Sequence, residues 1–194
     1  MEMINRAVQN FSKTEKWKKL VKFMGSTRIF PKRKLRLTKN DFKECQECAE
    51  IIRPGDVLLS KVWDQLNNIV IPGEYDHSAL YIGNGEIIET RGYPVSIRPL
   101  KKMFYADKVL LIRPQCVDEE YIQRMIEESK KYLGWPYDYA FSMRGEKEVY
   151  CSEFIYYADF EKRLSIPVKE RFGVKSVAPD DFLKGRYKEI KSWK

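Results

Sequence analysis

Apolar and polar residues follow two different patterns along the chain. Over residues 5–24, Trp17, Leu20 and Met24 recur at helical spacing, and lysines fill most of the positions between them. Beyond residue 40 the apolar runs are shorter and end at glycine or proline, which is typical of strands and short helices. The pattern therefore predicts an amphipathic leading helix and a separate folded region behind it.

Helices and strands are predicted to occur in blocks within the folded region. It begins with a helix over 40–52, for which Asn40 is the predicted N-cap, and a helix or long turn follows over 61–71. Strands are predicted at 56–60, 76–82, 86–91, 94–98 and 108–113, and further helices at 118–133 and 151–163. Because no βα unit repeats, the sequence predicts an α+β fold in which an antiparallel sheet or barrel packs against helices.

Basic residues are concentrated at the N-terminus. Residues 1–40 carry twelve Lys and Arg against two acids, a net charge of +10, so the rest of the chain is close to neutral at −2. We expect a basic N-terminal extension over 1–39 and one folded domain over 40–194. A protein that binds nucleic acid through its core would not divide its charge in this way, so we expect no nucleic-acid partner.

The basic extension is open to two interpretations. Its apolar stripe could dock on the folded domain, or it could lie on an anionic membrane surface that attracts its lysines. The chain has neither the long apolar run of a membrane span nor the apolar segment of a signal peptide. We therefore expect a cytoplasmic protein, either free or peripheral to a membrane.

The cysteines do not indicate a disulfide scaffold or a metal site. Four of them, at positions 45, 48, 116 and 151, are too few for a secreted disulfide-rich protein. Cys45 and Cys48 have the spacing of half a zinc site, but no second such pair exists and the one histidine lies elsewhere. We expect neither a metal nor another cofactor.

Cys151 and His77 are the candidate nucleophile and base. Cys151 opens the predicted helix 151–163, where free N–H groups and the helix dipole stabilise a thiolate and can bind an oxyanion. His77, the only histidine in the chain, stands at the start of a predicted strand. A thiol nucleophile needs a base with a near-neutral pKa, which histidine provides.

A third group should orient the imidazole, and Glu86, Glu89 and Thr90 are the local candidates. A three-residue loop over 83–85 would place Glu89 on the strand face of His77, whereas a two-residue loop over 84–85 would place Glu86 and Thr90 there. We favour Glu89, because a carboxylate best stabilises an imidazolium.

Five segments resemble those of a known family. They are PGDVLL (54–59), YDHSALYIG (75–83), IET (88–90), LGWPYD (133–138) and YCSEF (150–154). In order and spacing they are similar to the circularly permuted papain-like hydrolases of the NlpC type, in the YaeF/YiiX branch. The resemblance implies a permuted papain-like fold with Cys151 as nucleophile, His77 as base and Glu89 as the orienting acid.

The resemblance also implies amide-bond hydrolysis. We expect a cysteine amidase or peptidase that acts on a peptide-like or amino-acid-containing substrate through a thioacyl-enzyme. The alternative is a lipid acyl hydrolase or acyltransferase similar to lecithin:retinol acyltransferase, acting at a membrane surface. A non-catalytic binding module is a third class, against which the joint presence of Cys, His and Glu argues. Tyr75 is a candidate substrate-binding residue, since it would share the strand face of His77 if the strand began that early.

Overall fold

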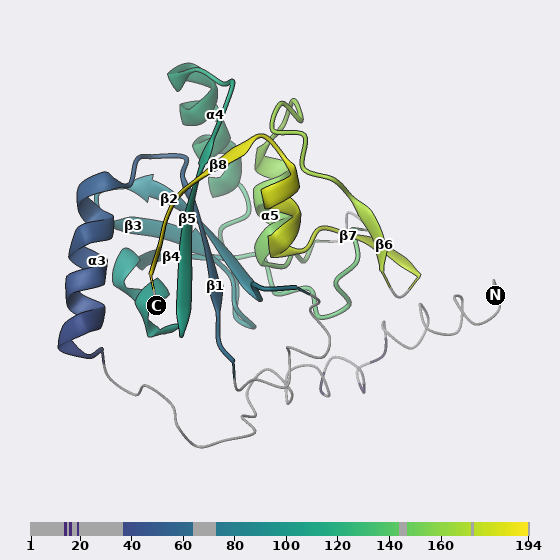
Figure 1. Ribbon diagram of the computed structural model, residues 1–194. Helices are drawn as coiled ribbons and strands as arrows, with labels where there is room; N and C mark the ends of the chain where they lie inside the picture. The colour runs from purple at the N-terminus through teal and green to yellow at the C-terminus, as the bar shows by residue number, and fades with distance from the viewer. Residues whose placement is uncertain are drawn as a thin grey trace.

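Figure 1 shows the computed structural model of the chain, which describes residues 37–63, 73–143, 147–171 and 173–193 and three single positions, Thr14, Lys16 and Lys19. Apart from those three positions, the amphipathic helix predicted over 5–24 lies outside the described residues, as does most of the segment predicted over 61–71. None of the described helices has the length and apolar character that a membrane span requires.

A six-stranded antiparallel sheet forms the centre of the fold, with strand order β4-β3-β2-β1-β5-β8. The strands are β1 (Val57–Lys61), β2 (His77–Gly83), β3 (Glu86–Glu89), β4 (Ser96–Pro99), β5 (Lys108–Pro114) and β8 (Tyr187–Trp193). The predicted α+β class with an antiparallel sheet is therefore confirmed. Within the described ranges no pairing joins the edge strands β4 and β8, so the sheet is open there and the predicted alternative of a barrel is not confirmed.

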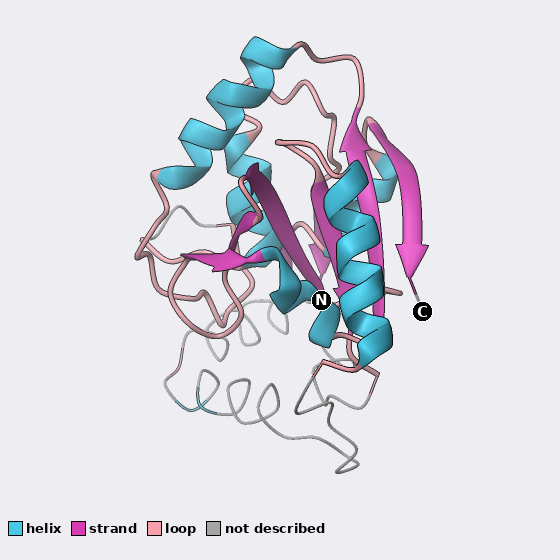
Figure 2. Cartoon of the chain, turned by 90° about the vertical axis from the view of Figure 1, so that its left-hand side faces the viewer, coloured by secondary structure: helices cyan, strands magenta, loops and turns pink. Residues whose placement is uncertain are grey.

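Helices cover the two faces of this sheet (Figures 1 and 2). The helical elements are α3 (Lys39–Ile51), η2 (Leu100–Tyr105), α4 (Glu119–Lys130), α5 (Cys151–Ala158) and η3 (Pro179–Lys184). Leu58 of β1 packs in one apolar cluster with Cys48 and Phe104, whereas its neighbour Leu59 packs in another with Met125 and Phe154. Successive side chains of a strand point to opposite faces, so burial on both sides explains the unbroken apolar run in β1.

The first helix of the folded region starts earlier than predicted. The Thr38 hydroxyl accepts a hydrogen bond from the Asp41 N–H at 3.2 Å, and the Asp41 carboxylate accepts one from the Thr38 N–H at 2.8 Å. This reciprocal capping box begins α3 at Lys39, so the prediction of Asn40 as N-cap is wrong. Asn40 lies inside the helix, where its side chain donates to Glu44.

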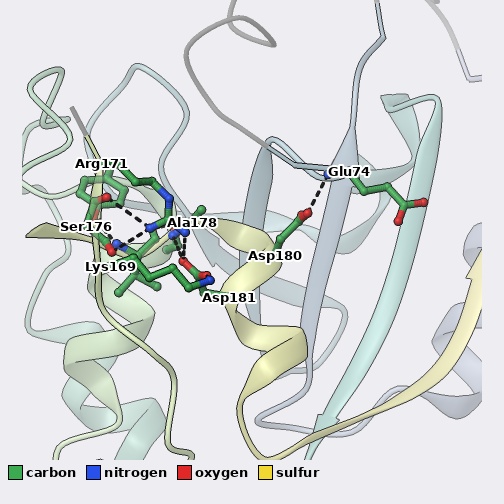
Figure 3. Close-up of polar contacts among 10 residues, drawn as sticks. Glu74, Lys169, Arg171, Ser176, Ala178, Asp180 and Asp181 are labelled. Atoms are coloured by element: carbon green, nitrogen blue, oxygen red, sulfur yellow. Dashed lines mark hydrogen bonds and ion pairs between the residues drawn. The ribbon is translucent and has the colours of Figure 1, made fainter.

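The last thirty residues contain elements that the sequence pattern did not predict. They are the hairpin of β6 (Lys169–Arg171) and β7 (Val174–Ser176), followed by η3 and β8. The buried Asp181 carboxylate accepts from the Ala178 N–H at 2.8 Å and from Arg171 at 2.5 Å, and it also pairs with Lys169 (Figure 3). These contacts hold the hairpin against η3.

Candidate active site

Cys151 is the first residue of α5, as predicted, and is 4% exposed. Two contacts with Val177 hold the start of this helix. The Tyr150 hydroxyl accepts from the Val177 N–H at 2.9 Å, and the Ser152 hydroxyl donates to the Val177 carbonyl at 2.7 Å. The buried Glu153 carboxylate accepts from the Tyr150 N–H at 3.3 Å. The first turn of α5 is therefore anchored to the segment that precedes η3.

His77 is the first residue of β2 and is almost fully buried. Its Nε2 lies 2.7 Å from Oε2 of Glu89, and its side chain also interacts with Cys151. Because Nε2 faces Glu89, Nδ1 is the ring nitrogen that remains for the thiol. The structure thus brings Cys151, His77 and Glu89 together in the order thiol, imidazole, carboxylate.

The hairpin between β2 and β3 differs from the loop that we favoured. Residues 84–85 form a two-residue turn, so the prediction of a three-residue loop is wrong. However, a bulge between Tyr81 and Gly83 absorbs one residue, and Leu80 pairs with Ile88. The bulge therefore restores the register that a three-residue loop would have produced.

This register separates the three candidates for the orienting group. Glu89 is buried beside His77, whereas Glu86 is exposed at the other end of β3. The Thr90 hydroxyl donates to the Tyr93 carbonyl at 2.5 Å, away from the imidazole. Of the three, Glu89 alone has a hydrogen bond to His77 among the described contacts.

The three side chains favour one another's charged forms. Burial disfavours the thiolate, but the hydrogen bond and positive charge of His77 outweigh it and lower the pKa of Cys151. Burial and the nearby Arg91 disfavour the imidazolium, but the hydrogen bonds to Cys151 and Glu89 raise the pKa of His77 to about 8. Burial likewise opposes the charge of Glu89, but the hydrogen bond from His77 lowers the pKa of Glu89 to about 2. The contacts among the three side chains therefore favour a thiolate–imidazolium pair supported by a carboxylate.

Ser78 is a site residue that the sequence analysis missed. It is fully buried on the face of β2 that also carries Leu80, which packs in the apolar cluster with Phe154 of α5. Burial raises the pKa of the Cys151 thiol and His77 lowers it, and the N–H and hydroxyl of Ser78 lower it further. The hydroxyl has no hydrogen bond of ordinary geometry to any described group. It is therefore available as a donor when negative charge develops on sulfur.

Tyr75, the predicted substrate-binding residue, lies in the core. It is 3% exposed and belongs to the same apolar cluster as Phe154, with the Lys108 ammonium 5.4 Å from its ring centroid. Since β2 begins at His77, the condition for a shared strand face is not met. Contact of Tyr75 with substrate stays a prediction.

The backbone just before His77 is held by η3. Asp180 accepts hydrogen bonds from the Glu74 N–H at 2.7 Å and from the Tyr75 N–H at 2.8 Å (Figure 3 shows the first). The buried Asp76 accepts from the Val62 N–H at 3.1 Å and pairs with Arg91 at 3.2 Å. The start of β2 is therefore fixed from both sides.

The loop over 133–138 lies beside the nucleophile helix. Tyr137 forms a bridge with Val149, just before α5 begins. The Asp138 carboxylate accepts from the Ala140 N–H at 2.6 Å and the Ser142 N–H at 2.8 Å, so this aspartate holds its own loop.

The pair of cysteines in α3 lies apart from this site. Burial raises the pKa of Cys48 to about 12 and also raises that of Cys45, which disfavours the thiolate that a metal ion would need. Over the described ranges, no group of three or more His, Cys, Asp or Glu side chains is placed to hold a metal ion.

A buried thiol at a helix start, beside an imidazole that a carboxylate supports, is the arrangement of a papain-like cysteine hydrolase. The histidine precedes the cysteine here, which is the permuted order. Residues 51–188 match the family model described as permuted papain-like amidase enzyme, YaeF/YiiX, C92 family. The chain belongs to this family and is a cysteine amidase of the papain-like class.

A solved structure supports the same fold. The chain is similar to the metalloprotein YiiX from Escherichia coli O157:H7, with a TM-score of 0.60 and 19% identity over 73% of this chain and 97% of that one. At this identity the likeness concerns the fold alone. No curated protein matches the chain.

Proposed function

We propose that the protein cleaves an amide bond in a peptide-like or amino-acid-containing substrate, with Cys151 as nucleophile, His77 as acid and base, and Glu89 as the orienting carboxylate. The observation that carries the proposal is the buried row of Cys151, His77 and Glu89, in which His77 is hydrogen-bonded to Glu89 at 2.7 Å and interacts with the thiol. Each residue stands at the end of an element, where the backbone fixes its position.

In the first half of the reaction the Cys151 thiolate adds to the amide carbonyl carbon. The carbonyl oxygen becomes an oxyanion, to which the free N–H groups at the start of α5 can donate. His77 then gives its proton to the amide nitrogen, the C–N bond breaks, and the amine leaves. A thioacyl-enzyme remains on Cys151, and His77 is neutral.

In the second half His77 takes a proton from water, and the hydroxide adds to the thioester carbon. Collapse of this intermediate breaks the C–S bond and releases the carboxylic acid. The thiolate and imidazolium are thereby regenerated. Glu89 stays ionised throughout and stabilises the imidazolium in each step.

The test is product analysis over two matched substrate panels. One panel contains N-acyl amino acids and dipeptides, and the other contains fatty acyl esters, thioesters and phospholipids presented in vesicles. We expect amine release from the first panel, an acyl adduct on Cys151 by intact mass, and no turnover by Cys151→Ala. Turnover of the lipid panel alone would replace this proposal with lipid acyl hydrolysis or transfer. Turnover by Cys151→Ala would reject the nucleophile.

A further inference from the structure

The Glu89 carboxylate is held at both of its oxygens. Oε2 lies 2.7 Å from Nε2 of His77, and Oε1 accepts a hydrogen bond from the Tyr93 hydroxyl at 2.5 Å. Glu89 is 4% exposed, so no bulk water competes for either oxygen. The carboxylate can therefore rotate away from His77 only if it gives up the bond to Tyr93.

The chain reverses between the two residues so that Tyr93 returns to Glu89. The Thr90 hydroxyl donates to the Tyr93 carbonyl at 2.5 Å, and Gly92 adopts a φ of 73°, which favours glycine. The Tyr139 hydroxyl donates to the backbone carbonyl of Gly92 at 2.8 Å, and neither Glu89 nor Tyr93 takes part in this bond. The five residues over 89–93 therefore form one fixed unit.

The Tyr93 ring is also held in place. The Arg98 guanidinium lies over the ring, 5.5 Å from its centroid. Burial and the negative charge of Glu89 raise the pKa of the Tyr93 hydroxyl well above its ordinary value. The hydroxyl therefore keeps its proton throughout the pH range in which His77 titrates, and it acts there as a donor.

We propose that Tyr93 is a positioning residue of the active site, whose hydroxyl holds the Glu89 carboxylate directed at His77. This inference rests on the proposed function, in which Glu89 supports the imidazolium. Tyr93 touches neither Cys151 nor His77 in the described contacts, so its effect passes through Glu89. Without the hydroxyl, Oε1 is left buried and unpaired, and the carboxylate turns to find another donor.

The expected effect of Tyr93→Phe is a fall in kcat of about tenfold, the size associated with one lost hydrogen bond to a buried charge. KM should stay within about twofold, since an interaction that supports only the charged imidazolium adds little to substrate binding. Tyr139→Phe is the matched control. It removes a hydroxyl that contacts the same turn from another segment, but one that binds a backbone carbonyl instead of Glu89.

The chain offers a readout that does not depend on turnover. His77 is the only histidine, so one set of imidazole signals in NMR reports its pKa without ambiguity. In Tyr93→Phe we expect the His77 midpoint to move to lower pH, in the direction of Glu89→Ala and by a smaller amount. Tyr139→Phe should keep the wild-type midpoint. An unchanged or raised midpoint in Tyr93→Phe would overturn the proposal, because the carboxylate would then still be directed at His77.

A double-mutant cycle distinguishes an effect of Tyr93 on the position of Glu89 from a general structural effect of the substitution. If Tyr93 acts through Glu89, adding Tyr93→Phe to Glu89→Ala should change neither kcat nor the His77 midpoint further. Additive losses would show a separate structural effect and would reject the inference. Failure of the proposed function and failure of the Tyr93 contact give different results. Activity that survives Cys151→Ala rejects the proposed function, whereas the His77 titration tests the Tyr93 contact whether or not a substrate is known.

Discussion

His77 and Glu89 lie on the two strands of a hairpin and meet on the same face. The turn of this hairpin has two residues, one fewer than that strand register requires. The bulge between Tyr81 and Gly83 supplies the missing residue, so that Nε2 and Oε2 lie 2.7 Å apart. Since side chains alternate along a strand, a regular two-residue hairpin would have turned Glu89 to the opposite face. A local irregularity of the backbone therefore determines which carboxylate supports the imidazole.

Glu89→Gln should lower kcat by about 10–10³-fold, since neutralising the orienting carboxylate of an analogous catalytic triad lowers kcat by up to about 10⁴-fold. The active form requires a protonated His77, and Glu89 helps to raise the pKa of His77 to about 8. Loss of the charge lowers that pKa, so the alkaline limb of the pH–rate profile should move to lower pH. The exposed Glu86, changed to Gln, is the control and should leave the profile in place. If Glu86→Gln lowered kcat and Glu89→Gln did not, the result would contradict the observed register of β2 and β3.

Cys151 should be the first cysteine to react with iodoacetamide at pH 6.5, followed by mass spectrometry of the peptides. The imidazolium favours its thiolate, whereas burial raises the pKa of both Cys45 and Cys48. Cys116 is exposed and provides the internal comparison. In His77→Gln the order should reverse, with Cys116 ahead of Cys151. Faster labelling of Cys116 in the wild type would show that exposure, not activation, governs reactivity.

Ser78→Ala should shift the pH dependence of Cys151 alkylation to higher pH, with a fall of about 3–10-fold in the rate at pH 6.5. The expected size is that of one hydrogen bond to a charged group. Ser129→Ala is the matched control, because Ser129 is also fully buried, but its hydroxyl donates to the Ile126 carbonyl within α4. Equal shifts in the two variants would assign the effect to cavity formation.

Residues 1–36 should confer binding to anionic vesicles and be dispensable for folding. The truncation begins at Leu37 because Thr38 caps α3. Each basic residue near an anionic surface contributes about 1 kcal/mol, and the +10 charge of residues 1–40 lies almost wholly in the removed segment. Sedimentation with phosphatidylserine vesicles should recover the full chain and not the truncated one. A lower thermal midpoint after truncation, with equal vesicle binding, would instead support a helix docked on the domain.

The sequence predicted the parts of the fold that depend on local pattern. Apolar runs between glycine and proline located β1, β2 and β5, and the position of Cys151 at a helix start followed from the helical pattern after it. The same reasoning misplaced the α3 cap, because Thr38 and Asn40 are both good capping residues and only the reciprocal contact with Asp41 separates them.

What the sequence could not predict depends on contacts between distant residues or on backbone irregularity. The bond from the Tyr75 N–H to Asp180 joins positions 105 residues apart, and no local pattern indicates it. The bulge in β2 has no sequence signature beyond Gly83. The sequence contained a weak indication of Ser78. Positions 78, 80 and 82 share one strand face, and Ser78 is the one residue with a hydroxyl on this otherwise apolar face.

The permuted order has a consequence for a chain made from its N-terminus. His77 and Glu89 leave the ribosome before Cys151, so the base and its carboxylate can pair while the thiol is still being added. The helix that carries the thiol is then anchored by Val177, and the backbone ahead of His77 by Asp180. Both anchors follow Cys151 in the chain. A nascent chain that stops short of them has the thiol, the imidazole and the carboxylate, but lacks the contacts that hold the start of α5 and the backbone ahead of β2.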